Sequence, residues 1–339
     1  MSNEEMVQVT DFPQVPGVPG LRFRRVGGEE DFKVMSVVGQ RSWDADGVEW
    51  VVTPEDIAHR FATKKDHDPR DDVLLAEVDG KIIGYSSLEW DTSDEDPKRY
   101  RSDVKLLPEW RDKGIREALF RYNEDEIRRI ASGHSRFPNR MIAVWANEAP
   151  NDWKRIVDST GYTPLWRMFE MAHTDLKGVA ETPLPAGIEV RPPRPEEYAK
   201  VWALFRECFQ DEKWSSPANW TEERYQEWLS SPMFMPSMIE AAWSGDTLVG
   251  TVETTMDEEQ CASLGKRVGR ADKVCVREGW RGKGIAMALL TRSLVRLRSM
   301  GAVEVNLDTE AENRSEAWRV YERAGYRIRR TFQFYEKPV

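Results

Sequence analysis

A loop between two apolar segments has the composition of a phosphate-binding site. It lies in the stretch VCVREGWRGKGIA, residues 274–286, and carries three glycines and two cationic side chains: Gly279, Gly282, Gly284, Arg281 and Lys283. Glycine lets a backbone turn tightly and approach a ligand, and the unpaired amides of a helix N-terminus favour negative charge. The loop is therefore predicted to bind a phosphate or pyrophosphate, although an ordinary strand-to-helix turn would have a similar sequence. Its spacing is not that of a P-loop.

The segments around this loop predict a mixed α/β sheet, because periods typical of strands alternate with a period typical of helices. An amphipathic helix is expected at 284–299, with Ile285, Ala288, Leu289, Leu294 and Leu297 on its buried side. The remaining elements are expected as strands at 188–191, 237–243, 247–255, 271–277 and 303–309 and helices at 195–209, 221–230 and 315–324, before a final strand pair.

The loop and its neighbours occur twice in the chain. WRDKGI at 110–115 parallels WRGKGI at 280–285, and three further landmarks recur in the same order. Such a repeat predicts two copies of one domain, which we place at 20–175 and 188–339, joined by a polar linker at 176–187. Residues 1–19, rich in Pro and Gly, are expected to form a disordered leader.

Charge and composition narrow the class of protein. The chain has 339 residues, a formal net charge of −10 and 32% charged residues, so we expect no binding to nucleic acid or to anionic membranes. Its 3 cysteines and 4 histidines show no metal-ligand spacing, so no metal is expected. No apolar run is long enough to span a bilayer and the N-terminus lacks a signal-peptide pattern, which favours a cytoplasmic protein.

Two motifs in the second copy resemble the signatures of the GCN5-related N-acetyltransferases (GNAT). Residues 281–286 match R/Q-x-x-G-x-G/A, and 311–327 resemble N-x-x-x-A-x-x-x-Y-x-x-x-G-[FY]. The second motif is carried by Asn313, Ala317, Tyr321, Gly325 and Tyr326. The resemblance covers 188–339 and, more loosely, 20–175. It implies two tandem GNAT-like domains, a layout similar to that of mycothiol synthases.

The resemblance also implies roles for individual residues. The backbone at Val274 and Val276 would pair with the pantetheine arm of acetyl-CoA, and the pyrophosphate would be held by the backbone amides of Arg281, Gly282, Lys283, Gly284, Ile285 and Ala286. Asn313 would hydrogen-bond the cofactor or a water near the thioester. Tyr321 would protonate the departing thiolate, as a phenol can when charge develops on sulfur. Tyr321 as a core aromatic residue and Asn313 as a helix cap are the alternatives.

An acceptor amine must lose a proton before it attacks the thioester, so a base or a water relay is needed. In many relatives a glutamate near the start of the central strand serves, but Arg270 stands at that position here. Asp272 is a substitute two residues further along, and Glu253 and Asp257 are rivals; each is also compatible with a solvated surface carboxylate.

The first copy departs from the signature at each chemical position. Asp112 replaces Gly282 and Arg116 replaces Ala286, while Val157 and Ala149 stand where the second copy has Tyr321 and Asn313. The residues that the first copy shares with the second are those needed for packing and for the geometry of the turn. We therefore expect no catalysis in this half, although Arg116 could still pair with a phosphate and preserve some CoA binding.

These observations predict an acetyl-CoA-dependent N-acetyltransferase that moves acetyl directly to a primary amine of a small molecule, as a monomer or homodimer. Five tryptophans of the second copy are candidates for lining the acceptor pocket, or for core packing: Trp202, Trp214, Trp220, Trp228 and Trp243. A non-catalytic CoA-binding or scaffold protein is the main alternative. Transfer of a longer acyl chain, or transfer to a hydroxyl, also remains open.

Overall fold

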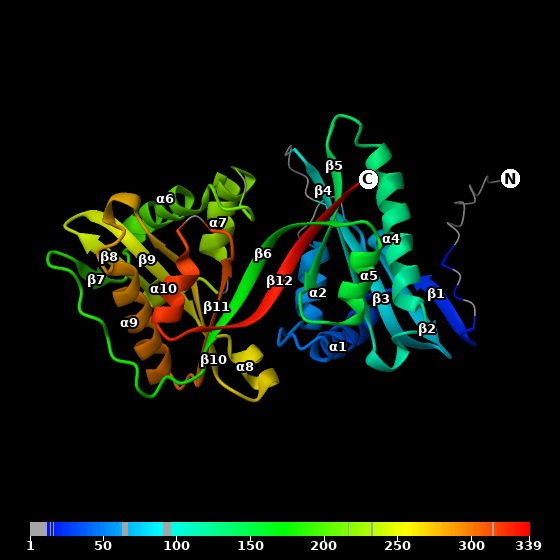
Figure 1. Cartoon of the computed structure of the whole chain (residues 1–339), viewed down its shortest axis with the longest axis horizontal. Coiled ribbons are helices and arrows are strands. Elements are labelled where there is room, and N and C mark those ends of the chain that lie inside the picture. Colours follow the sequence, from blue (N-terminus) through cyan, green and yellow to red (C-terminus); the bar gives the residue numbers. More distant parts are fainter. Residues whose placement is uncertain are drawn as a thin grey trace. The chain divides into compact units, whose positions relative to one another are not determined.

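The structure is a computed structural model, and it describes residues 12, 13, 15, 17–62, 67–90, 96–215, 217–231, 233–313 and 315–339 (Figure 1). The chain forms two compact units: unit 1 comprises Met1–Leu165 and Phe334–Val339, and unit 2 comprises Trp166–Gln333. Most of the predicted leader, residues 1–11, 14 and 16, lies outside the described residues. In the described part of the chain, no helix combines the length and apolar character needed to cross a membrane.

Unit 1 is built on an open mixed sheet with strand order β1-β2-β3-β4-β5, and the end of the last strand of the chain follows β5. Strands β4 and β5 are parallel, and the other neighbouring pairs in this run are antiparallel. The elements are β1 (Leu21–Arg25), α1 (Glu29–Ala45), α2 (Pro54–Ala62), α3 (Pro69–Asp72), β2 (Val73–Val78), β3 (Lys81–Trp90), β4 (Lys98–Leu106), η1 (Pro108–Trp110), α4 (Ile115–Ser132), β5 (Arg140–Asn147) and α5 (Asp152–Ser159).

Unit 2 repeats this arrangement, with strand order β12-β6-β11-β10-β9-β8-β7. Strands β10 and β11 are its parallel pair. The elements are β6 (Thr163–His173), β7 (Glu189–Arg191), η2 (Pro195–Glu197), α6 (Tyr198–Phe209), η3 (Pro217–Trp220), α7 (Glu222–Ser230), η4 (Pro236–Met238), β8 (Ile239–Ser244), β9 (Thr247–Thr255), α8 (Glu258–Leu264), β10 (Val268–Val276), η5 (Glu278–Trp280), α9 (Ile285–Ser299), β11 (Glu304–Glu310), α10 (Ala317–Arg323) and β12 (Arg327–Pro338). The predicted mixed α/β fold is confirmed.

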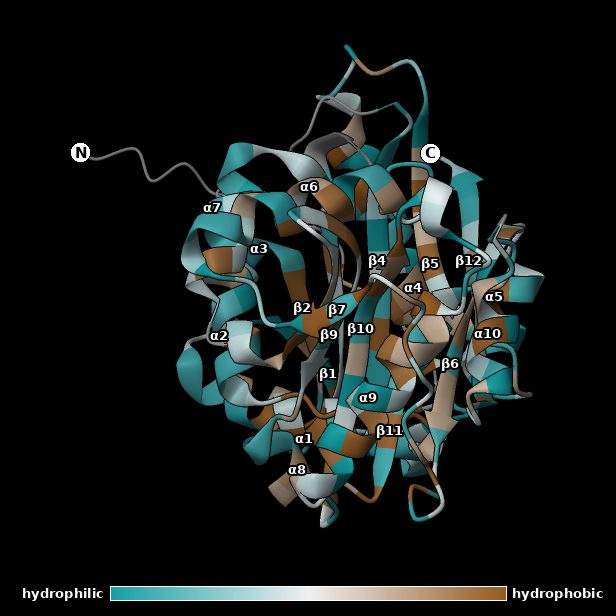
Figure 2. Cartoon of the chain, turned by 90° about the vertical axis from the view of Figure 1, so that its left-hand side faces the viewer, coloured by the Kyte–Doolittle hydropathy of each residue, from teal (hydrophilic) through white to brown (hydrophobic). Residues whose placement is uncertain are grey.

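Helix α9 positions the glycine loop, because it begins directly after it at Ile285. The side predicted to be buried is buried, and it packs in the core of unit 2 with residues of β9, β10 and β11. Each fully buried Leu on this face contributes about 1.5–3 kcal/mol of transfer free energy. Figure 2 shows the resulting mixture of hydrophobic and hydrophilic residues along α9. The start of the helix is therefore held firmly at the end of β10.

The compact units divide the chain at positions other than the predicted linker. Strand β6 ends the first sequence copy, yet its residues 168–173 pair with residues 305–310 of β11 inside unit 2. In turn, the end of β12 belongs to unit 1, where the Val339 amide donates to the Arg140 carbonyl. Each copy thus places part of its last strand in the other unit. Strand pairing sets the boundaries of the two units, and the amino-acid composition of the linker does not reveal which strands pair.

Strands β10 and β11 pair at one end only. The parallel register joins Val268–Arg270 to Glu304–Asn306 and stops there, in the described part of the chain. Beyond this point β10 remains paired with β9, with a register shift between Asp272 and Cys275 in which Lys273 adopts a φ of 49°. Such a bulge bends the strand locally. The two parallel strands therefore separate, and the opening lies beside the glycine loop.

Candidate active site

A cavity of about 1490 Å³ opens between the separated strands of unit 2. Its wall includes every sequence-predicted site residue except Lys283 and Asp257: Glu253, Asp272, Val274, Val276, Arg281, Gly282, Gly284, Ile285, Ala286, Asn313 and Tyr321. These residues come from β9, β10, the glycine loop, the start of α9 and the region of α10. One cavity thus contains both the predicted phosphate loop and the predicted proton donor.

The glycine loop has the open backbone that a phosphate requires. Gly282 and Gly284 have φ values of 75° and 85°, in the left-handed region that favours glycine. A Cβ added at either position would meet no atom within 4 Å, so the space in front of the loop is free. The first amides of α9 face this space without intrahelical partners. The local geometry suits an anion at the helix N-terminus.

The two cations of the loop have different places. The Arg281 Nε donates to the Val276 carbonyl at 3.0 Å, which ties the loop to the end of β10. The Lys283 Nζ lies 4.7 Å from the centre of the Trp280 ring and does not line the cavity. The positive charge of Lys283 therefore lies at the rim, and Arg281 is the loop cation that reaches the cavity wall.

The backbone of β10 presents a carbonyl to the opening. Successive residues of a strand direct their carbonyls to opposite sides, so Val274 and Val276 face the same way. The carbonyl of Val276 accepts from Arg281, while β11 pairs with β10 only as far as Arg270 in the described residues. Val274 is therefore placed where an extended ligand could pair with the strand edge.

Tyr321 is the buried phenol of the cavity. It is 6% exposed, packs edge-on against Tyr326 with ring centroids 6.4 Å apart, and lines the cavity. No described residue forms a hydrogen bond with its hydroxyl. Burial, and after it the negative charges of Cys275, Glu212 and Asp272, raise the pKa of Tyr321. The phenol is therefore protonated at neutral pH, as a proton donor must be.

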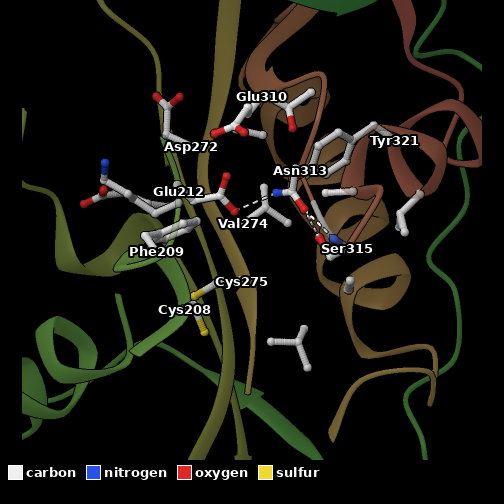
Figure 3. A pocket seen from close by; sticks show the side chains of 18 of the residues that line it. Cys208, Phe209, Glu212, Asp272, Val274, Cys275, Glu310, Asn313, Ser315 and Tyr321 are labelled. Carbon is white, nitrogen blue, oxygen red and sulfur yellow. Dashed lines mark hydrogen bonds between the residues drawn. The ribbon is translucent and has the colours of Figure 1, made fainter. Parts of the chain in front are cut away.

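Two glutamates that the sequence did not single out lie next to Asn313. The Asn313 Nδ2 donates to the Glu212 Oε1 at 2.7 Å, and its Oδ1 accepts from the amide and hydroxyl of Ser315 (Figure 3). Glu310, at the end of β11, accepts from the Lys213 amide at 2.8 Å and is 4% exposed. Burial and, second, the charge of Glu310 raise the pKa of Glu212 to about 7. Glu212 is thus poised to exchange a proton near neutral pH.

The carboxylates proposed as bases from the sequence lie further along β9 and β10. Asp272 accepts two hydrogen bonds from Arg270, at 3.1 and 3.2 Å, and Arg270 also bonds Asp308. Glu253 accepts from the Trp228 Nε1 at 3.1 Å, and burial raises the pKa of its carboxyl. Asp257 caps the N-terminus of α8 and lies outside the cavity wall.

The aromatic residues divide between wall and core. Trp214 and Trp228 line the cavity. Trp202 and Trp220 pack in an aromatic cluster with Trp228 behind that wall, with Trp202–Trp220 centroids 5.3 Å apart. Trp243 is fully buried in the core. The helix-spaced tryptophans therefore serve mainly in packing, which is the commoner role of such residues.

The corresponding place in unit 1 is occupied by Arg116. Its side chain is only 3% exposed, and its guanidinium donates to the Asp152 carboxylate at 2.9 Å and to the Val104 carbonyl at 3.1 Å. Val104 corresponds to Val274, because β4–β5 and β10–β11 share one parallel register. Arg116 also forms an ion pair with Asp46. The alternative left open for Arg116, pairing with a phosphate, is not favoured by this arrangement, because Asp46 and Asp152 hold its guanidinium inside the unit.

The loop of unit 1 keeps its backbone shape without its glycine. Asp112 adopts a φ of 60°, close to that of Gly282, and Gly114 has a φ of 76°. The Asp112 carboxylate forms an exposed ion pair with Arg155. An aspartate can therefore occupy this turn, and the change alters the charge of the loop while preserving its fold.

Comparison with known proteins agrees with this geometry. Residues 198–326 match the model of the acetyltransferase (GNAT) family. A mycothiol acetyltransferase of Geodermatophilus obscurus is 27% identical over 262 residues, covering 75% of this chain and 78% of that protein. A GCN5-related N-acetyltransferase of Sphaerobacter thermophilus superposes with a TM-score of 0.72 at 22% identity, covering 95% of this chain and 96% of the other. A tandem GNAT protein from the clavulanic acid biosynthesis pathway gives a TM-score of 0.64 at 14% identity, covering 94% and 98%.

The chain is thus similar to GNAT-family N-acetyltransferases over most of its length, residues 198–326 match the model of that family, and the length and structural neighbours fit the tandem layout. The family match begins at α6 and ends after α10, so it contains the cavity of unit 2 and the residues that line its two ends.

The residues that sequence reasoning missed are Glu212 and Glu310. Glu212 lies in an acidic turn, Gln210–Lys213, that resembles any solvated helix end. Glu310 offered a weak signal, since it ends a strand three residues before the signature Asn313. Nothing in the sequence links Glu212 to Glu310, because the two side chains come close only when the turn after α6 folds over the end of β11.

Proposed function

We propose that the chain transfers the acetyl group of acetyl-CoA directly to a primary amine of a small molecule, with the active site in the cavity of unit 2. The observation that carries the proposal is the continuity of this cavity. It joins an anion-binding loop at Gly282–Gly284 to a buried phenol without a hydrogen-bond partner among the described residues, Tyr321, along an open strand edge. The reaction needs these three parts in one place.

The residues present fit acetyl-CoA. The loop amides would hold the pyrophosphate, the Val274 edge would pair with the amides of the pantetheine arm, and the thioester would then lie toward Tyr321. When bound, acetyl-CoA supplies an acetyl group activated as a thioester. The chain's own part is to orient that group, to exclude water from it and to protonate the leaving sulfur.

The decisive experiment incubates the full-length protein with acetyl-CoA and a panel of primary amines, each paired with its hydroxyl analogue. Thiol release and the mass of the product are followed together. Acetylated amine, with thiol release that depends on the amine, supports the proposal. Tight acetyl-CoA binding without transfer to any amine would favour the non-catalytic CoA-binding alternative, and faster reaction of hydroxyl analogues or longer acyl-CoAs would change the substrate class.

Binding stoichiometry distinguishes the two units. We expect one acetyl-CoA per chain in isothermal titration calorimetry, because Arg116 and its ion pairs fill the place in unit 1 that corresponds to the opening in unit 2. Two sites of similar affinity would contradict this account of unit 1. Substitutions in the cavity of unit 2 should abolish acetyl-CoA binding at this one site.

Replacement of Gly282 by Asp should weaken acetyl-CoA binding about 10-fold, because it places a negative charge beside the pyrophosphate. The fold should survive, since Asp112 already adopts the same turn in unit 1. Gly282→Asn is the matched control: it has the same shape and tolerates positive φ, but it is neutral. The gap between the two dissociation constants should narrow as salt is raised. Equal affinities for the two variants at low salt would count against a phosphate at this loop.

A further inference from the structure

The reaction needs a group that takes a proton from the acceptor, and the Glu212–Glu310 pair is placed to do so. We infer that Glu212, supported by Glu310 and Asn313, binds the ammonium group of the acceptor and removes its proton before attack. This inference rests on the proposed function and extends it in two ways. It names the base, and it restricts the acceptor to amines that arrive as cations.

The position of Glu212 carries the argument. Its carboxyl accepts a hydrogen bond from Asn313, which precedes Tyr321 in the same signature. Figure 3 shows Glu212, Glu310, Asn313 and Tyr321 in one part of the cavity. Glu212 is also among the charges that act on the Tyr321 hydroxyl. Tyr321 is 6% exposed, lines the cavity and has no hydrogen-bond partner for its hydroxyl among the described residues, so this hydroxyl marks where the reacting group must lie.

The competing carboxylates are less available. Both oxygens of the Asp272 carboxylate already accept hydrogen bonds from Arg270, so they are engaged within the protein. Glu253 is bonded to Trp228 and lies opposite Asp272 in the β9–β10 register, near the bulge rather than beside Asn313. Glu212 has no cation bonded to its carboxyl among the described residues, and its nearest charged neighbour is another carboxylate.

The proton balance is complete without an added reactant. The acceptor ammonium passes one proton to the Glu212 carboxylate, which later releases it to solvent. The free amine then forms the C–N bond to the acetyl carbon, and the C–S bond breaks with its electron pair on sulfur. Sulfur takes the proton of Tyr321, and the second proton of the attacking nitrogen restores the phenol through solvent. The net result is an amide, free CoA and one proton.

Several charged groups face Glu212 and set its titration. They come from its own turn, from β11 and from the glycine loop: Asp211, Lys213, Glu310 and Arg281. Burial and Glu310 raise the pKa of Glu212, while Arg281 lowers it by a smaller amount. A carboxyl of raised pKa is a better base than an ordinary glutamate and still loses its proton near neutral pH. Turnover should therefore increase with pH through about 7, as Glu212 ionises.

Glu212→Gln tests the inference, because Gln keeps the acceptor atom for Asn313 and cannot accept the proton. We expect kcat to fall about 100-fold and the increase of kcat with pH near 7 to disappear. Acetyl-CoA affinity should stay within about 2-fold. The pH profile is recorded with two accepted amines of different pKa, so that an ionisation of the protein, common to both, is separated from that of the substrate. Glu227→Gln, which removes an exposed glutamate paired with Arg224, is the control.

Glu310→Gln supplies a second, independent readout. It removes the neighbouring charge, so the step in the kcat profile should move to lower pH while Glu212 remains the base. Unchanged profiles in both variants would overturn the inference, and so would a loss of kcat in Glu212→Gln with the step still near pH 7. Failure of the wild-type protein to acetylate any amine would instead refute the proposed function. Thermal melting of each variant checks that the fold is kept.

Discussion

Tyr321→Phe should lower kcat by about 100-fold while acetyl-CoA binds with nearly unchanged affinity. The substitution removes one hydroxyl that has no partner among the described residues, so nothing else in the cavity loses a hydrogen bond. The ring itself stays, and with it the packing on Tyr326. Only the step in which sulfur departs is affected, because the thiolate loses its proton donor. Steady-state thiol release gives kcat, and calorimetry gives the affinity.

Tyr326→Phe is the matched control for this prediction. Tyr326 is fully buried beside Tyr321, and its hydroxyl also lacks a partner in the part of the chain that the structure describes, but it does not line the cavity. Its loss should leave kcat close to that of the wild type. If both variants turned over like the wild type, Tyr321 would not be the acid, and a protein that binds CoA without chemistry would have to be reconsidered.

Ala286→Arg should weaken acetyl-CoA binding by about 100-fold or more, which at 1.4 kcal/mol per tenfold corresponds to about 3 kcal/mol. The reason is visible in unit 1, where Arg116 holds the equivalent position one residue into α4. That side chain turns inward and donates to the Val104 carbonyl, the counterpart of Val274. An arginine at 286 would find Glu212 and Glu310 in the cavity and occupy the same edge of β10.

The affinity of Ala286→Arg is measured by calorimetry on the full-length protein. Ala286→Ser, which adds one atom and no charge, should bind acetyl-CoA almost as the wild type does. A thermal melt must show that the arginine variant is folded. If the arginine variant bound acetyl-CoA as tightly as the serine variant, the cofactor would not pass between α9 and β10. Arg116 would then not explain why unit 1 is expected not to bind acetyl-CoA.

The glycine loop and the Asn313–Tyr321 spacing were predictable because each is a local pattern. A loop needs its glycines at fixed positions to reach positive φ, and Asn313 and Tyr321 belong to one short signature whose second part is helix α10. Local patterns of this kind can be recognised from a short run of consecutive residues. Helix α9, whose apolar residues predicted to be buried are all buried, was predictable on the same ground.

Other outcomes depended on the folded structure. Lys283 belongs to the loop motif, but its ammonium lies over the Trp280 ring and does not line the cavity. Trp243 was grouped with four other tryptophans as a candidate for the acceptor pocket, yet it is fully buried in the core and does not line the cavity. The burial of the Arg116 guanidinium inside unit 1 depended on ion pairs with Asp46 and Asp152, which lie far from it in sequence.

The sequence by itself determined the resemblance to the GNAT signatures, the duplicated α/β plan and the half of the chain that retains the phosphate loop, since backbone geometry and helical periodicity follow from neighbouring residues. Only the tertiary structure decided where β10 and β11 separate, which unit holds β6, and that Glu212 and Glu310 meet beside Asn313. Those facts arise from strand pairing and from burial. Both are properties of residues far apart in the chain, and burial is also what raises the pKa of Glu212 to about 7.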